Sequence, residues 1–123
     1  MEFQKDNSFL TGRFKSIGFA IKGALKLITT EHSVMVQSSL VVLMTFAGFY
    51  FKIDRYEWIM QIFSLGLVLS IEGLNTAVEK IADFIHPEFH DRIGFIKDIA
   101  AGAVFFAALT AVIIGCLIYV PKF

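Results

Sequence analysis

Three long apolar stretches restrict this chain to a small set of folds. Val34–Phe51 and Ile99–Val120 contain no charged residue, and a stretch between them begins near Trp58 and stays apolar through Ile71. A helix of about 20 apolar residues is long enough to cross the hydrocarbon core of a bilayer. The sequence therefore predicts three transmembrane helices, over about 33–51, 57–84 and 98–120.

The composition supports a membrane protein with a single domain. Of the 123 residues, 56% are hydrophobic. A soluble domain of this size is mostly surface and could not bury so much apolar area. The formal net charge is zero, which gives no reason to expect a nucleic-acid partner. We therefore expect one all-α membrane domain over residues 1–123.

A basic amphipathic helix is predicted before the first span, over about 9–29. Its apolar residues recur every three or four positions and so share one face. They are Phe14, Ile17, Ile21, Leu25 and Ile28. Lysines gather on another face, at positions 15, 22 and 26. Such a helix lies in the plane of the membrane surface with its apolar side down.

The distribution of Lys and Arg predicts how the spans are oriented. The two richest segments are the N-terminal segment and the loop between the second and third spans. Their basic residues are Lys5, Arg13, Lys15, Lys22 and Lys26, then Lys80, Arg92 and Lys97. Cytoplasmic loops carry an excess of such residues. We therefore expect the N-terminus and this second loop on the cytoplasmic side.

A polar stripe runs along the end of the second span. Glu72, Asn75, Glu79 and Asp83 fall within an arc of about 80° on one face of a helix, and the stripe is roughly 16 Å long. Carboxylates at bilayer depth cost a few kcal/mol each and usually mark functional sites. Such acids can bind a hard cation or accept a proton from a hydroxyl. The alternative is a structural role as hydrogen-bonding contacts between helices.

Other residues near the stripe allow phosphate chemistry. Glu31, at the start of the first span, could join Glu79 in an oxygen-ligand site of the kind that magnesium prefers. Alone, Glu31 would be an ordinary acid at a helix N-terminus. Lys97 could neutralise phosphate charge, because phosphoryl transfer depends on positioning and charge stabilisation. Equally, Lys97 could be a lysine that reaches from the span end to the interface.

The motif Glu72-Gly-Leu-Asn75-Thr-Ala-Val-Glu79-x-x-x-Asp83, followed by Lys97-Asp98-x-Ala-Ala-Gly-Ala-Val, resembles the bacterial integral-membrane diacylglycerol kinase and undecaprenol kinase family. The resemblance covers about Phe9–Phe123. It implies a homotrimer of three-span protomers with active sites at subunit boundaries. It also implies transfer of the ATP γ-phosphate to a lipid hydroxyl, with Mg²⁺ as cofactor.

The same resemblance assigns roles to individual residues. Glu72 would be the general base, Asn75 would orient groups beside it, and Glu31 and Glu79 would hold the magnesium ion. Lys97 would meet the γ-phosphate, supported by Asp83 and Asp98. The remaining nucleotide contacts would be Gly12, Phe19, Glu88 and His90, and the lipid would lie against Glu72 and Ala101. Phe19 stands where many members have Tyr, and Gly12 where an Arg is found in some members.

These observations predict an ATP-dependent lipid kinase of the bacterial cytoplasmic membrane. The favoured reaction converts diacylglycerol to phosphatidic acid, and phosphorylation of undecaprenol is the alternative within the family. A hypothesis from a different functional class is an oligomeric ion channel or transporter, whose membrane acids carry protons or cations. Lys97 and Asp98, together with the basic cytoplasmic face, favour nucleotide handling over ion transport.

Overall fold

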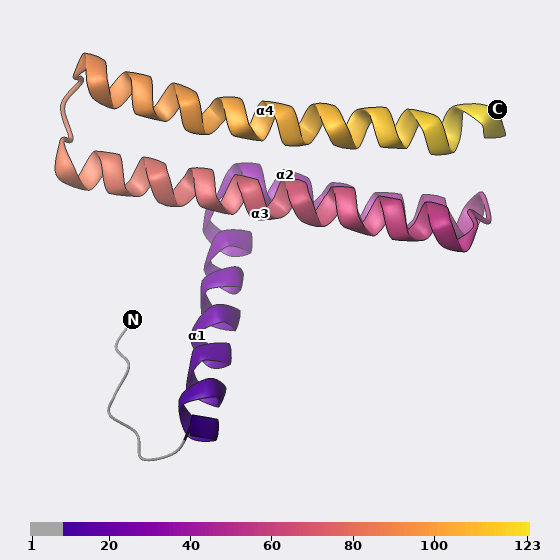
Figure 1. The fold of residues 1–123 in the computed structure, drawn as a ribbon, viewed down its shortest axis with the longest axis horizontal. Helices are drawn as coiled ribbons and strands as arrows, with labels where there is room; N and C mark the ends of the chain where they lie inside the picture. The colour runs from indigo at the N-terminus through magenta and orange to yellow at the C-terminus, as the bar shows by residue number, and fades with distance from the viewer. Residues whose placement is uncertain (1–8) are drawn as a thin grey trace.

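The computed structural model describes residues 9–123, which form four α-helices and a short 3-10 turn (Figure 1). The helices are α1 (Phe9–Thr30), α2 (His32–Tyr50), α3 (Arg55–Ile85) and α4 (Asp91–Tyr119), and the turn η1 covers Val120–Lys122. Three of the helices, α2, α3 and α4, are long and apolar enough to cross a membrane. The predicted all-α membrane fold is therefore confirmed.

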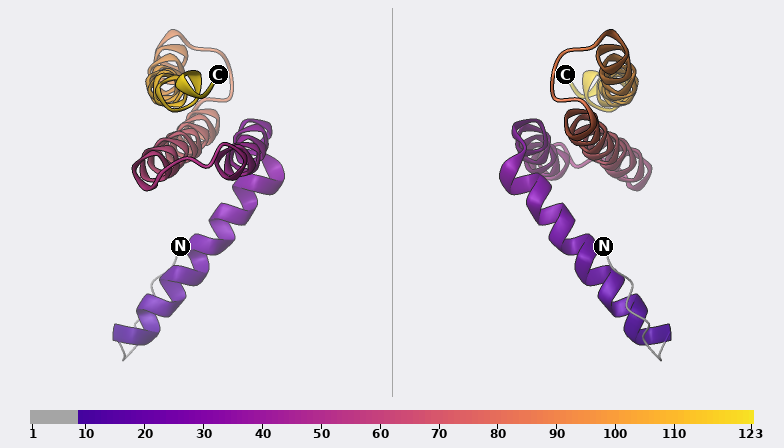
Figure 2. Two further views of the ribbon diagram at one scale, coloured as in Figure 1. Left: turned by 90° about the vertical axis from the view of Figure 1, so that its right-hand side faces the viewer. Right: turned by 90° about the vertical axis from the view of Figure 1, so that its left-hand side faces the viewer.

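The three long helices lie alongside one another, with α3 in contact with both α2 and α4 (Figure 2). Helix α1 turns away from them at Glu31 and runs across their direction (Figure 1). The turn occurs because Glu31 has extended backbone angles, φ −104° and ψ 117°, between two helices. Helix α1 buries none of its residues in this chain, as expected for a helix that lies on a membrane surface.

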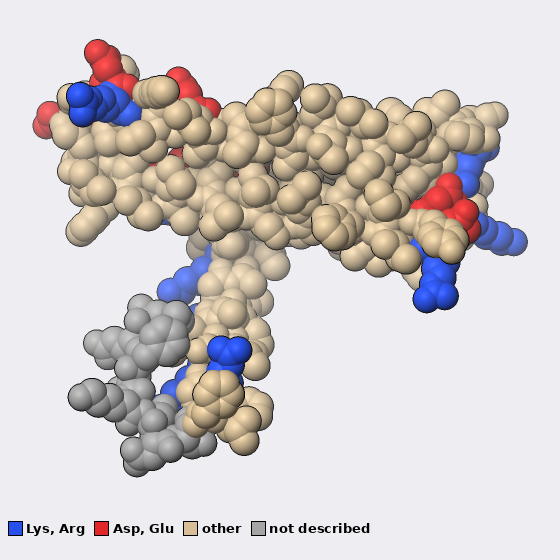
Figure 3. All heavy atoms as spheres, viewed as in Figure 1, with Lys and Arg blue, Asp and Glu red and all other residues tan. Residues whose placement is uncertain are grey.

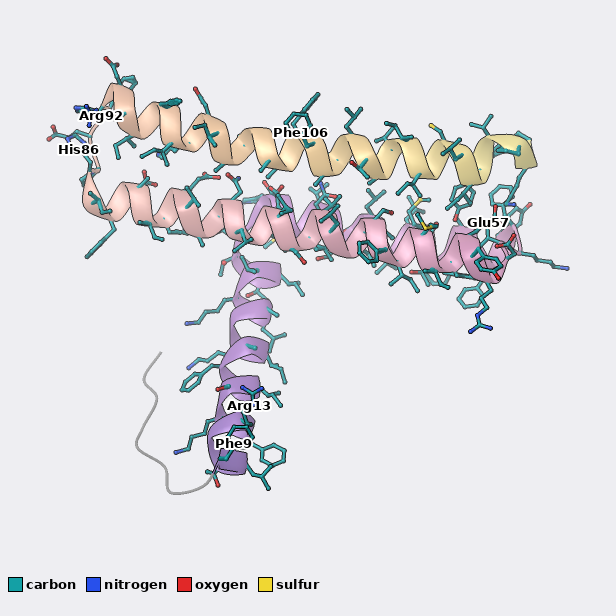
Figure 4. The ribbon with its side chains drawn as sticks, viewed as in Figure 1. Phe9, Arg13, Glu57, His86, Arg92 and Phe106 are labelled. Carbon is teal, nitrogen blue, oxygen red and sulfur yellow. The ribbon has the colours of Figure 1, made fainter. Side chains whose placement is uncertain are left out.

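The distribution of charge agrees with a membrane orientation of the long helices. Charged side chains on the visible face gather at the two ends of the long helices and on α1, and the middle is almost free of them (Figure 3). Large apolar side chains point outward from the middle. Phe106 of α4 is one of these and is 69% exposed (Figure 4). Surface of this kind is suited to lipid or to further protein chains rather than to water.

The end of the long helices at which α2 passes into α3 is held by several polar contacts. Asp54 caps α3, because its Oδ1 accepts a hydrogen bond from the Glu57 backbone N–H at 2.8 Å while Glu57 Oε1 accepts one from the Asp54 N–H at 2.9 Å. Lys122 donates to the same Glu57 carboxylate at 3.2 Å. Gln61 joins all three helices, since its Nε2 donates to the Met44 carbonyl at 2.9 Å and its Oε1 accepts from the Tyr119 hydroxyl at 2.5 Å.

The opposite end differs from the sequence expectation in the length of its helices. Helix α4 begins at Asp91, seven residues before the span expected from 98, and only residues 86–90 connect it to α3. The early start has a local cause. His90 caps α4, with its Nδ1 accepting from the Arg92 N–H at 3.1 Å, and Asp91 lies in the first turn, where a negative charge stabilises a helix. Residues 86–90 of the predicted polar loop lie outside the helices, and the charged residues that follow them belong to α4.

Candidate active site

The polar stripe predicted on the second span lies on α3, and two of its members are bonded to each other. Asn75 Nδ2 donates a hydrogen bond to Glu79 Oε1 at 2.8 Å. Because a carboxylate only accepts, this bond fixes which end of the amide faces Glu79. The other end, Asn75 Oδ1, is buried and has no hydrogen-bond partner among the described residues. A buried acceptor without a partner is costly, so this oxygen is available to a ligand.

Glu72 is the buried acid of the stripe. It is 6% exposed, and within residues 9–123 its carboxylate has neither a hydrogen bond nor an ion pair, although its backbone carbonyl accepts from Thr76 Oγ1. The corner between α1 and α2 lies beside it, because a Cβ on Gly73 would meet Leu27 Cδ1 at 3.1 Å. This buried carboxylate therefore has no neutralising cation within the described residues.

Lys97 reaches across from α4 to the stripe. Its Nζ donates to Asp83 Oδ1 at 2.6 Å. Both residues line a cleft of about 250 Å³ at the turn between α3 and α4, together with Glu88 and His90. The structure therefore brings together four of the residues predicted to contact the nucleotide.

Sequence reasoning missed His86 as a residue of this cleft. The His86 ring lies 5.3 Å from the His90 ring, centroid to centroid, and its Nδ1 lies 2.7 Å from the Glu88 carbonyl oxygen. Both His86 and Arg92 mark this end of the molecule in Figure 4. The spacing of four residues between His86 and His90 was the only available signal, and it is not specific.

The two acids predicted to hold magnesium each have a partner in the structure. Glu31 Oε1 lies 3.1 Å from Lys80 Nζ, and Glu79 accepts from Asn75. Lys80 follows Glu79 directly, so the ion pair brings Glu31 to the same level of α3. The carboxylate oxygens of Glu31 and Glu79 are ligands of the kind that magnesium prefers. No cluster of three or more His, Cys, Asp or Glu suited to a metal occurs in the described part of the chain.

Some predicted residues lie apart from this group. Gly12 and Phe19 are on α1, which runs away from the cleft (Figure 1). Asp98 lines a separate groove of about 660 Å³ with Asp91 and Phe95, because neighbouring residues of a helix point about 100° apart and Lys97 already faces α3. Ala101 is exposed on α4, one turn further along. In a single chain, these four residues are not part of the cleft.

The fold and the site define a three-span membrane enzyme with acids and a lysine at one end of its spans. Residues 18–119 match the family model described as prokaryotic diacylglycerol kinase. The chain belongs to this family and is a lipid kinase, as the resemblance predicted. Together with its three apolar helices, this makes it a bacterial membrane protein.

Individual relatives agree with the family assignment. The chain is 32% identical over 122 residues to undecaprenol kinase of Bacillus subtilis, covering 99% of each protein. It is 30% identical over 104 residues to diacylglycerol kinase of Escherichia coli K12, covering 85% of each. A shorter stretch of 57 residues is 46% identical to diacylglycerol kinase of Synechocystis, covering 45% of this chain and 33% of that protein. These relatives favour the kinase hypothesis over the channel or transporter hypothesis.

Proposed function

We propose that this lipid kinase transfers the γ-phosphate of ATP to the hydroxyl of a membrane lipid beside Glu72, with diacylglycerol as the first candidate substrate. The observation that carries the proposal is the buried Glu72 carboxylate, which has no partner within residues 9–123. It shares one helix face with Asn75, Glu79 and Asp83. Lys97 lies against the far end of that face. A proton acceptor and a phosphate-binding cation are thus at two ends of one stripe.

In this proposal Glu72 takes the proton of the lipid hydroxyl, the hydroxyl oxygen attacks the γ-phosphorus, and ADP leaves. Asn75 Oδ1 accepts a hydrogen bond within the loaded site, which satisfies an acceptor that is otherwise unpaired. Lys97 neutralises charge on the transferred phosphoryl group, and Asp83 holds the lysine in position. Electrostatic stabilisation of this kind supplies much of the rate in phosphoryl transfer.

Glu31 and Glu79 would hold the magnesium ion. Their carboxylates are hard oxygen ligands, and magnesium sites of nucleotide enzymes commonly use one or two carboxylates plus phosphate oxygens. When bound, the ion would neutralise phosphate charge. On this proposal, Lys80 must leave Glu31 before the ion can be held there.

The orientation we propose has α1 on the cytoplasmic surface of the inner membrane. Helix α1 meets α3 near Gly73, and α3 and α4 continue past that level toward their turn (Figure 1). A membrane surface at the level of α1 would leave Glu72 at the lipid boundary and the Asp83–Lys97 pair outside it. Lipid hydroxyl and ATP could then meet at the stripe. The N-terminus and the turn between α3 and α4 would both be cytoplasmic.

We also propose that the active form is a homotrimer with composite sites. Gly12 and Phe19 lie away from the cleft in their own chain, so a neighbouring protomer would have to supply them. Combining a Glu72→Gln chain with a Phe19→Ala chain tests this, because some sites of a mixed oligomer would then have Glu72 from one protomer and Phe19 from the other. Restored activity supports sharing, and complete inactivity of verified mixed oligomers contradicts it.

Undecaprenol is the second candidate substrate. The specific observation is the match to the Bacillus subtilis undecaprenol kinase, which covers 99% of this chain and so includes the N-terminal region. Both candidate lipids offer a hydroxyl at the interface. Purified protein should be given γ-labelled ATP, Mg²⁺ and each lipid in mixed micelles. A labelled phospholipid from one lipid identifies the substrate, and no product from either contradicts the proposal.

A further inference from the structure

The ion pair between Lys80 and Glu31 joins α3 to the corner between α1 and α2. Glu31 lies at the corner between α1 and α2, and Lys80 lies on α3, directly after Glu79. Lys80 Nζ and Glu31 Oε1 are 3.1 Å apart. Lys80 is therefore paired with one of the two carboxylates that would hold magnesium.

The ion pair lies at the surface of the described chain. The Lys80 side chain is 71% exposed and that of Glu31 is 25% exposed. Exposed ion pairs hold their partners weakly, because water and salt screen them. Glu31 makes no side-chain cap bond to α2, so its carboxylate is not committed to the helix end. Lys80 can thus leave Glu31 without breaking a buried contact.

From this geometry we propose that Lys80 is the resident counter-ion of Glu31 and competes with the divalent cation for it. In the metal-free protein, the ammonium group of Lys80 pairs with the Glu31 carboxylate. Lys80 would have to move into solvent for Glu31 to hold the cation. The positive charge that Lys80 keeps nearby also repels the cation, so both effects lower metal affinity. Lys80 is in this sense a positioning residue, and the inference rests on the proposed metal ligands of the kinase site.

Binding of Mn²⁺ alone, without nucleotide or lipid, tests the proposal independently of activity. Free Mn²⁺ is measured by electron paramagnetic resonance with the protein in neutral detergent. Lys80→Gln should bind Mn²⁺ about two- to five-fold more tightly than the unmodified protein, which is the range that an exposed ion pair supports. Lys80→Arg keeps the charge and should bind like the unmodified protein. Equal affinity in Lys80→Gln overturns the proposal.

A matched control lies at the opposite end of the molecule, where Lys122 pairs with Glu57 at 3.2 Å. Lys122→Gln removes one positive charge far from the stripe and should leave Mn²⁺ affinity unchanged. If Lys122→Gln raised Mn²⁺ affinity as much as Lys80→Gln, the effect would come from net charge in general, and the proposal would be overturned. Unchanged Mn²⁺ binding in Glu31→Gln would overturn both this proposal and the assignment of Glu31 as a metal ligand. The kinase function would be unaffected by that result if the unmodified protein phosphorylates lipid.

Discussion

Lys97 Nζ of α4 lies 2.6 Å from Asp83 Oδ1 of α3, so the predicted phosphate-binding lysine is held by an acid of the polar stripe. Lys97→Met should reduce turnover by about 10²-fold, because it removes one charge that stabilises the transferred phosphoryl group. Asp83→Asn keeps the lysine but weakens its orientation, and we expect a loss of about ten-fold. Transfer of labelled phosphate to lipid measures both.

The control for this pair is Lys122→Met, which breaks the Glu57 ion pair at the far end of the spans. It should leave turnover unchanged. If Asp83→Asn loses more activity than Lys97→Met, then Asp83 does more than orient the lysine, and the proposed relationship is wrong.

The two acids that would hold magnesium should be recognisable by their metal dependence. Glu31→Ala and Glu79→Ala each remove one hard oxygen ligand, so the magnesium concentration for half-maximal activity should rise by about ten-fold or more. Magnesium titrations at fixed ATP and lipid measure this change. An unchanged half-saturation with a lower maximum rate would show that neither carboxylate is a ligand.

Because α2 and α3 are in close contact at Gly48, we expect a larger residue there to lower stability. A Cβ on Gly48 would lie 2.5 Å from Trp58 Cη2, and this tryptophan ring also packs against Phe49 at 5.0 Å between centroids. Gly48→Ala should lower the free energy of unfolding by about 1–3 kcal/mol, because the ring must shift. Gly115→Ala is the matched control, since a Cβ there meets nothing within 4 Å. Denaturant unfolding in micelles compares them, and equal stability would contradict the contact.

We expect substitution of Gln61 to lower the stability of the folded protein. It is 4% exposed and bonds to both α2 and α4. Gln61→Leu should destabilise the protein by about 0.6–2 kcal/mol, because it removes the side-chain donor to the Met44 carbonyl and the acceptor of the Tyr119 hydroxyl. Thr110→Val removes only a bond within α4 and should have little effect. A Gln61→Leu protein as stable as this control would mean that the three-helix contact contributes nothing.

The sequence predicted the helices and the stripe because both follow from helical periodicity. Span lengths depend on the run of apolar residues, and Asn75 and Glu79 had to be neighbours on any helix because they are four residues apart. The contact of Lys97 with Asp83 could not be derived in the same way. It depends on how α4 packs against α3, which is set by contacts between residues far apart in sequence.

Other parts of the site could not be predicted for local reasons. The start of α4 at Asp91 precedes the apolar run that defines the span, so the apolar pattern does not predict it, and it depends on the local cap by His90. The ion pair of Lys80 with Glu31 joins residues 49 positions apart, so it depends on how α3 packs against the corner between α1 and α2. The roles of Gly12 and Phe19 came from the family resemblance and stay predictions, because α1 does not reach the cleft of its own chain.

Glu72→Gln gives the most direct test of the account, which assigns the removal of the lipid proton to Glu72. The substitution keeps the size of the side chain and its hydrogen-bonding capacity but cannot take up the proton. Transfer of labelled phosphate from ATP to lipid should fall by about 10²–10⁴-fold, the range for loss of a general base. Nucleotide binding and the folded state should be retained. Near-normal transfer by a folded Glu72→Gln protein would contradict the account.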